Sequence, residues 1–189
     1  MLNVYLLGAS NLVRLHRSPY FRRQFGGLNV ISISRGGAKV KDGLTNFNDY
    51  LDGNEIDKNN SVIFINLGTN NIRDEDQLSF DRTSYIKIVR IARKLFHHIF
   101  ICKTPLIPQI EDSVERISAI NKWINTFNSI SNVSILDLVT PFLIDTESFY
   151  IRFYPPNKDG ARRADLIHFN SRGKRVVTDI FLRAVRSVD

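Results

Sequence analysis

Short apolar runs alternate along the chain with longer segments in which apolar residues recur every three or four positions. The runs are continuously apolar, which is typical of strands buried on both faces of a sheet. Most of them are followed directly by glycine, proline or polar residues that favour a turn. The pattern therefore predicts five strands, at residues 4–7, 28–33, 62–67, 98–102 and 133–136.

The segments between the runs have helical spacing. In the clearest of them, apolar residues at positions 40, 44, 47 and 51 fall on one face of a helix. The same spacing predicts helices over residues 11–25, 40–51, 85–96, 114–130 and 171–188, and Pro19 is expected to split or restart the first. Residues 137–164 contain three prolines and are expected to be irregular. Strands that alternate with helices predict an α/β fold with three layers, in which helices cover both faces of a central parallel sheet of about five strands.

The composition is that of an ordinary globular protein, with 43% apolar and 24% charged residues among 189. We find neither a repeat nor a linker, so residues 1–189 are expected to form a single domain. Because no apolar run approaches the roughly 20 residues of a membrane span, no integral membrane association is expected. The N-terminal residues lack the basic start and the cleavage site of a signal peptide, and a cytoplasmic or otherwise intracellular location is expected.

The cysteine, histidine and charged residues show which kinds of site and partner the sequence excludes or favours. Cys102 is the one cysteine, which excludes an internal disulfide and a cysteine-based zinc site, and the four histidines have no tight group of carboxylates around them. We therefore expect no metal site. The formal charge of +7 has two interpretations, a solvated surface or the footprint of an anionic partner such as RNA or an anionic lipid. The candidates for such binding lie in the last predicted helix: Arg172, Lys174, Arg175, Arg183 and Arg186.

Candidate chemistry lies where the predicted strands end, because parallel α/β sheets bind ligands at the carboxyl ends of their strands. The first three strands are followed by residues 8–11, 34–38 and 68–71. A nucleophilic serine there, such as Ser10, needs a base, and the base needs an acid that orients it. Asp165 and His168 stand three residues apart, a spacing that lets the carboxylate reach Nδ1 and leaves Nε2 to take a proton.

Each of these residues also has an ordinary structural explanation. Ser10 could cap the helix that follows it, and Asn70 could be a turn residue. Asp165 could be a loop acid, and His168 could be a histidine at the edge of the core. These explanations together require four coincidences, so we favour the catalytic interpretation.

The order and context of these segments resemble the SGNH (GDSL-like) hydrolase superfamily over nearly the whole chain. The Gly-Asp-Ser block of that family is similar to Gly8-Ala9-Ser10, and the Gly-x-Asn-Asp block is similar to residues 68–71. Its Asp-x-x-His block is matched by Asp165 and His168. The resemblance implies a flavodoxin-like α/β/α fold and a catalytic triad of Ser10, His168 and Asp165.

The resemblance also implies an oxyanion hole and a reaction. The hole would consist of the N–H groups of Ser10 and of a glycine after the second strand, Gly37 or alternatively Gly36, with the side-chain amide of Asn70. The implied reaction is serine hydrolysis of small esters with short acyl groups, acetyl above all, without a metal or organic cofactor. The basic balance suggests two settings. One is an esterase domain that works beside nucleic acid, similar to those of some retrotransposons. The other, the alternative function, is a non-catalytic RNA-binding module that resembles the SGNH-like domain of Oskar.

Two residues depart from the family pattern. Ala9 stands where the family usually has aspartate, and Asn71 stands where the third block often ends in aspartate. Neither position belongs to the triad, and the sequence Gly-Thr-Asn-Asn resembles the platelet-activating-factor acetylhydrolase branch. We expect both departures to alter the hydrogen bonding around the Ser10 loop.

Overall fold

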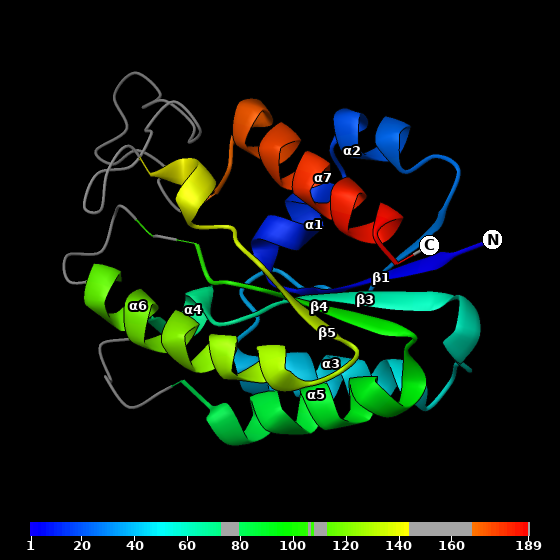
Figure 1. Ribbon diagram of the computed structural model, residues 1–189, viewed down its shortest axis with the longest axis horizontal. Helices are drawn as coiled ribbons and strands as arrows, with labels where there is room; N and C mark the ends of the chain where they lie inside the picture. Colours follow the sequence, from blue (N-terminus) through cyan, green and yellow to red (C-terminus); the bar gives the residue numbers. More distant parts are fainter. Residues whose placement is uncertain (73–79, 106, 108–112, 144–167, 189) are drawn as a thin grey trace.

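The structure, a computed structural model, describes residues 1–72, 80–105, 107, 113–143 and 168–188. Its centre is a five-stranded parallel sheet in the order β2-β1-β3-β4-β5 (Figure 1). The strands are β1 (Asn3–Gly8), β2 (Asn29–Ser32), β3 (Ser61–Asn66), β4 (His98–Cys102) and β5 (Val133–Leu136). The predicted α/β fold is confirmed, whereas the single domain over residues 1–189 stays a prediction.

Two layers of helices cover the sheet (Figure 1). One face carries α1 (Ser10–His16), α2 (Pro19–Gln24) and α7 (Ser171–Arg186). The other face carries α3 (Val40–Leu51), α5 (Arg82–Leu95) and α6 (Ser113–Ile124), while the one-turn helix α4 (Thr69–Ile72) comes shortly after β3. Pro19 occupies the first turn of α2 and separates it from α1 as predicted, because proline is tolerated at a helix start and not inside one.

The helix predicted over residues 114–130 is shorter in the structure. It ends at Ile124 and continues as a 3-10 helix, η2 (Asn125–Ser129). In this turn the hydroxyls of Thr126 and Ser129 donate to nearby backbone carbonyls, which competes with regular helical geometry. The structure also contains α4 and two 3-10 helices that were not predicted, η1 (Lys58–Asn60) and η3 (Thr140–Phe142), since single turns are too short to show a period. Residues 144–164 of the predicted irregular segment lie outside the described residues.

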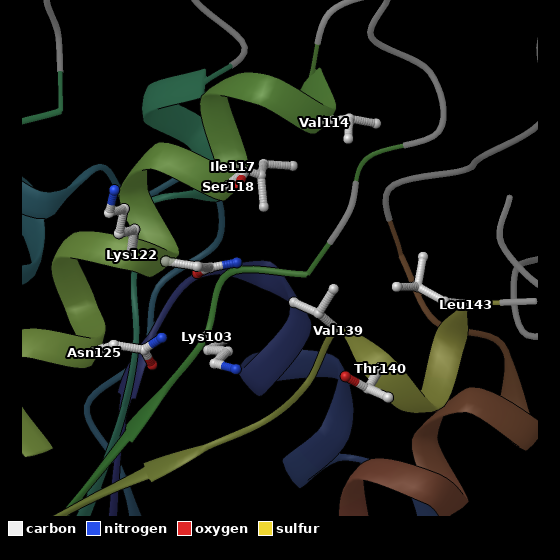
Figure 2. Close-up of a pocket in the computed structure, with 10 residues that line it drawn as sticks. Lys103, Val114, Ile117, Ser118, Lys122, Asn125, Val139, Thr140 and Leu143 are labelled. Atoms are coloured by element: carbon white, nitrogen blue, oxygen red, sulfur yellow. The ribbon is translucent and has the colours of Figure 1, made fainter. Parts of the chain in front are cut away.

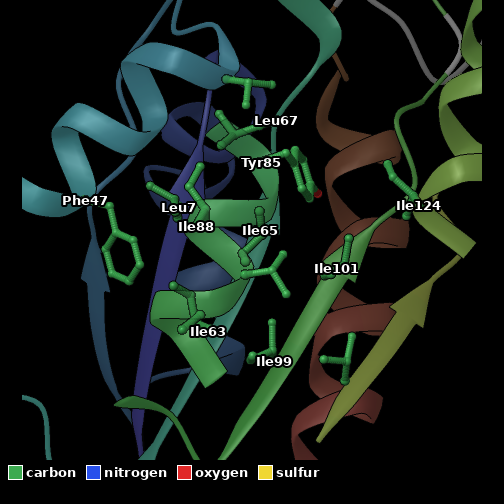
Figure 3. Close-up of a cluster of buried hydrophobic side chains, with 14 of the residues drawn as sticks. Leu7, Phe47, Ile63, Ile65, Leu67, Tyr85, Ile88, Ile99, Ile101 and Ile124 are labelled. Atoms are coloured by element: carbon green, nitrogen blue, oxygen red, sulfur yellow. The ribbon is translucent and has the colours of Figure 1, made fainter. Parts of the chain in front are cut away.

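The sheet has a core on each face, because successive side chains of a strand point in opposite directions. On the α3/α5/α6 face, the strands bury a row of isoleucines against the helices (Figure 3): Ile63, Ile65, Ile99 and Ile101. On the α1/α7 face, the ring of Phe64 stacks on those of Phe100 and Phe181, with centroids 4.8 and 4.1 Å away. Burial on both faces explains the continuously apolar runs, and it holds the carboxyl ends of neighbouring strands together at one edge.

Candidate active site

Ser10 lies at the junction between β1 and α1. Gly8 closes β1 where an added Cβ would come 2.6 Å from the carbonyl oxygen of Asn66 on β3, so the close approach of the two strands requires glycine. Ala9 is the N-cap residue of α1 and makes no side-chain capping bond, which leaves Ser10 as the first residue of the helix. The Ser10 hydroxyl oxygen lies 2.8 Å from Nε2 of His168. Ser10 is thus not the cap of this helix.

The two residues that follow His168 are anchored, one in a buried aromatic stack and the other at a helix start. Asn170 caps α7, its side-chain oxygen accepting the N–H groups of Arg172 and Gly173 at 2.9 and 3.0 Å. Phe169 is buried and stacks on Phe142 of η3, with ring centroids 4.6 Å apart. These contacts fix the backbone directly after the residue that carries the imidazole. Asp165, the predicted acid, lies outside the described residues.

The loop after β2 is tied to the loop after β3 by two neighbouring asparagines. Nδ2 of Asn70 donates to the carbonyl oxygen of Ala38 at 3.0 Å, and Oδ1 of Asn71 accepts the N–H of Val40 at 3.0 Å. Both asparagines are buried. A bond between residues 32 positions apart is more than a local turn requires, so Asn70 connects two loops that the sequence places far apart.

These two bonds also place the predicted oxyanion donors on adjoining segments. Gly37 directly precedes Ala38, and its φ of 76° is a left-handed conformation that glycine adopts without strain. A Cβ on Gly37 would meet no atom within 4 Å, so glycine is favoured there for its conformation and not for lack of space. Gly36 has open space as well and an ordinary φ. Of the two glycines, Gly37 is therefore the one whose backbone conformation favours glycine.

The structure gives a physical role to one of the two departures from the family pattern, Asn71. At the other, Ala9, the carbonyl oxygen accepts the N–H groups of Leu12 and Val13, and these are main-chain bonds that an aspartate there would also make. Asn71 offers a neutral acceptor to the first N–H of α3, which otherwise has no partner within its own helix. This bond of Asn71 to Val40 could not be predicted from the sequence, because the acceptor and the donor are 31 positions apart.

Asn121 on α6 is a further residue that sequence reasoning missed. Its side chain exchanges two hydrogen bonds with the backbone of Thr104, accepting the N–H at 2.8 Å and donating to the carbonyl at 2.9 Å. These two hydrogen bonds, called the Asn121 clasp below, hold the chain at Thr104, shortly after the end of β4. The Thr104 hydroxyl lies 3.2 Å from the position that a Cβ on Gly68 would occupy. The signal was the position of Asn121, four residues after Ile117 and three before Ile124, on the apolar stripe of the predicted helix.

A cavity of about 330 Å³ opens beside this clasp, between α6 and the chain that follows β5 (Figure 2). Apolar walls from Ile117, Val139 and Leu143 face polar groups that include Lys103 and Thr140. The cavity adjoins the segments described above: Asn121 is in its wall, and its residues Thr140 and Leu143 flank the Phe142 that stacks beside His168.

One charged pair lies at this cavity. Nζ of Lys103 is 3.5 Å from Oδ2 of Asp137. Burial by itself raises the pKa of Asp137, but hydrogen bonds from the Thr140 hydroxyl and from the N–H groups of Val139 and Thr140, together with Lys103, lower it overall. The carboxylate is therefore held in its charged form as the partner of Lys103.

The other candidate residues lie elsewhere. Cys102 is fully buried and burial raises the pKa of its thiol, as expected of a core residue. His98 at the start of β4 contacts the Ser134 hydroxyl at 2.9 Å.

Within the described ranges, no three His, Cys, Asp or Glu side chains form a group that could hold a metal ion. The helices that the structure describes include none long and apolar enough to cross a membrane. On α7, Lys174 is half-buried and four arginines are exposed: Arg172, Arg175, Arg183 and Arg186.

Known proteins share this architecture. The chain is similar to a GDSL-like lipase from Bacteroides thetaiotaomicron VPI-5482, with a TM-score of 0.74 and 13% identity over 99% of this chain and 88% of that one. It is similar to a member of the lipolytic protein G-D-S-L family from Veillonella parvula DSM 2008, with a TM-score of 0.75 and 16% identity over 97% of both chains. It is also similar to the acetyl xylan esterase AlAXEase, with a TM-score of 0.71 and 18% identity over 97% of this chain and all (100%) of that one. No curated protein sequence matches the chain.

The chain has the α/β/α fold of these GDSL-type (SGNH) proteins, as the sequence motifs suggested. Residues 12–176 match the GDSL-like Lipase/Acylhydrolase family, and the chain belongs to that family. The matched range begins two residues after Ser10 and includes Asn70 and His168.

Proposed function

We propose that the protein is a serine ester hydrolase in which Ser10 is the nucleophile, His168 the base and Asp165 the acid that orients it. The observation that carries this proposal is the 2.8 Å separation between the Ser10 hydroxyl oxygen and Nε2 of His168. This separation lies within the range over which a general base can take the proton of an attacking hydroxyl. Family membership supports hydrolysis as the reaction class.

In the proposed reaction, His168 carries its proton on Nδ1, so that Nε2 accepts the Ser10 hydroxyl proton as the oxygen attacks the acyl carbon. The imidazolium then donates that proton to the leaving alcohol, and an acyl-serine remains. Water attacks this ester in turn and loses a proton to Nε2, and the imidazolium gives that proton to the Ser10 oxygen as the acid leaves. Asp165 would accept a hydrogen bond from Nδ1–H and stabilise the imidazolium in both halves of the reaction.

The negative charge that develops on the acyl oxygen needs donors that are already in place. We propose the N–H groups of Ser10 and Gly37 and the side-chain amide of Asn70 as these donors. An amide NH₂ has two hydrogens, so the bond from Asn70 to Ala38 leaves the second for the oxyanion. Such a donor contributes roughly 3–4 kcal/mol in comparable sites.

The substrates we propose are esters of short acyl groups, with acetyl the first to test. The cavity beside the Asn121 clasp, about 330 Å³ in volume, suits a small group with both apolar and polar surface. The fold neighbour named as an acetyl xylan esterase supports testing acetylated sugars together with simple aryl esters. A non-catalytic RNA-binding module remains the alternative, and it predicts no turnover of any ester.

The deciding experiment compares hydrolysis of p-nitrophenyl acetate and p-nitrophenyl butyrate by the wild type, Ser10→Ala and Ser134→Ala. Ser134 is a matched control, because its hydroxyl also contacts a histidine Nε2, that of His98, at 2.9 Å. Turnover by the wild type and by Ser134→Ala, with loss in Ser10→Ala, is the expected result. Full activity in Ser10→Ala would mean that another residue is the nucleophile.

A further inference from the structure

The layer of helices formed by α1, α2 and α7 carries more net positive charge than the opposite layer. The segments that form α1, α2 and α7 contain eight Lys or Arg residues and a single acidic residue, Asp179. The opposite layer, formed by α3, α5 and α6, contains eight basic and three acidic residues. The net charges of these two sets of helices are therefore +7 and +5.

The arginines of α7 form a line along the helix. Arg172, Arg175, Arg183 and Arg186 are all exposed, and their spacing of three, eight and three residues follows the helical repeat along one stripe. At 1.5 Å per residue this stripe is about 21 Å long. Asp179 lies within it, but its carboxylate accepts the hydroxyl of Tyr20 on α2 at 2.9 Å. The one acidic group of the stripe is thus already engaged.

Tyr20 joins the charges of α2 to those of α7. The guanidinium carbons of Arg23 and Arg175 lie 5.5 and 5.4 Å from the centroid of the Tyr20 ring. Both distances fall within the range of cation–π attraction, which orders these two side chains. Among the residues that the structure describes, no α7 arginine forms an ion pair with a carboxylate within 4 Å, whereas Lys103 and Asp137 do form such a pair.

We propose that this basic face, defined as Arg23, Arg172, Arg175, Arg183 and Arg186, binds the phosphate backbone of a nucleic acid strand. All five residues are arginines, whose planar guanidinium group suits bidentate contacts to phosphate. A line of about 21 Å spans several consecutive phosphates of one strand. The face offers no exposed aromatic platform for bases, so binding is independent of base sequence.

The same surface fits a lipid bilayer less well. Helices that lie on membranes insert large apolar side chains between the lipid head groups. Among the described residues, the exposed large hydrophobics are Met1 and Val114, and neither belongs to α1, α2 or α7. The face therefore supplies charge without the apolar groups that a membrane contact needs.

The test is a titration of fluorescein-labelled 20-nucleotide oligouridylate, followed by anisotropy at 50 and 200 mM salt. Neutralising about four phosphates of a single strand predicts binding about 50-fold weaker at the higher salt, because bound counterions are released. The variant Arg183→Glu/Arg186→Glu is expected to bind at least tenfold more weakly than the wild type at 50 mM salt. Its matched control is Arg90→Glu/Arg93→Glu on α5, which has the same spacing, exposure and charge change and is expected to bind within about twofold of the wild type.

Three results would overturn the proposal: no binding by the wild type at 50 mM salt, equal loss in the two variants, or binding to phosphatidylserine vesicles without binding to the RNA. Thermal unfolding and ester turnover of both variants show that each is folded. Because Arg183 and Arg186 lie at the far end of α7 from His168, turnover is expected to be retained. Ser10→Ala is expected to bind the RNA as the wild type does, so the outcomes for hydrolysis and for nucleic acid are independent.

Discussion

Two serine–histidine contacts with nearly the same length occur in different regions of this protein. The hydroxyl oxygen of Ser10 lies 2.8 Å from Nε2 of His168, and that of Ser134 lies 2.9 Å from Nε2 of His98. The first pair joins a helix start to the loop ahead of α7, at the carboxyl ends of the strands. The second joins the first residue of β4 to the interior of β5.

The surroundings of the two pairs differ more than their distances do. Ser10 begins α1 directly after β1, at the edge of the sheet where Gly37 and Asn70 also follow the ends of their strands. Around Ser134, the backbone is part of a parallel ladder, in which it pairs with Phe100. A short contact is therefore not sufficient for catalysis, because an attacking hydroxyl also needs unpaired donors placed where charge develops.

Removing the histidine of each pair gives the largest expected difference. We expect His168→Ala to reduce ester turnover by about 10⁴–10⁶, to the same degree as Ser10→Ala, and the double variant to lose no more, since the two residues act in one step. His98→Gln keeps a polar group at its position and is expected to retain turnover. Steady-state kinetics of the four variants provide the measurement. A double variant much slower than either single one would show that the two residues act separately.

The next largest expected effect distinguishes the two asparagines of α4, because substitution of one should lower kcat and substitution of the other should lower stability. Asn70→Ala is expected to lower kcat by about 10²–10³, because it removes a proposed oxyanion donor. Asn71→Ala leaves the buried N–H of Val40 without its acceptor and is expected to cost about 1–3 kcal/mol of stability with a smaller change in kcat. Kinetics and urea unfolding of both variants distinguish these effects. If the two variants showed the same kcat and the same stability, Asn70 would be a structural residue only.

A stability effect is expected where β1 approaches β3. Gly8→Ala places a methyl group 2.6 Å from the carbonyl oxygen of Asn66, so the Ser10 turn must move, at a cost of about 1–3 kcal/mol. The control is Gly27→Ala, where no atom lies within 4 Å of the added methyl group, and its stability is expected to stay within about 0.5 kcal/mol of the wild type. Urea unfolding measures both. Equal stability of the two variants would contradict the close approach at Gly8.

The smallest expected effect is on the pH dependence of the free energy of unfolding, to which His98 of the second pair contributes. Burial, together with the neighbouring charge of His97, lowers the pKa of His98 below its ordinary value. The unfolded chain therefore binds a proton more readily than the folded one, so stability is complete above about pH 6.5 and falls as the pH drops below it. We expect the free energy of unfolding to fall less between pH 7 and pH 5 in His98→Gln than in the wild type. An equal fall in both proteins would show that His98 does not contribute.

Much of the fold could be predicted from the sequence, because burial leaves a local signature. The runs that formed β3 and β4 are apolar at successive positions since each strand is covered on both faces, and the period of α3 appears directly in its apolar residues. Single turns such as α4 and η3 could not be predicted, since four residues show no period. The end of α6 at Ile124 depends on hydroxyl-to-backbone bonds that a hydrophobic pattern does not record.

In the candidate site, too, some features could be predicted from the sequence and others could not. The positions of Ser10 and Asn70 after predicted strands followed from the sequence, since a strand end is a local feature, and so did the placement of His168 just ahead of the last helix. The bond from Asn71 to Val40 and the Asn121 clasp did not, because each joins segments whose distance depends on packing.

By itself, the sequence determined which segments are strands and helices and which residues stand at their ends, because these depend on the chemistry of near neighbours in the chain. The tertiary structure alone decided that β1 lies between β2 and β3, and that the Ser10 hydroxyl meets a histidine 158 positions away. It also decided that the arginines of α2 and α7 converge on one tyrosine ring. Such distances arise from the packing of whole helices against the sheet, a property of the assembled core that no single segment of the chain contains.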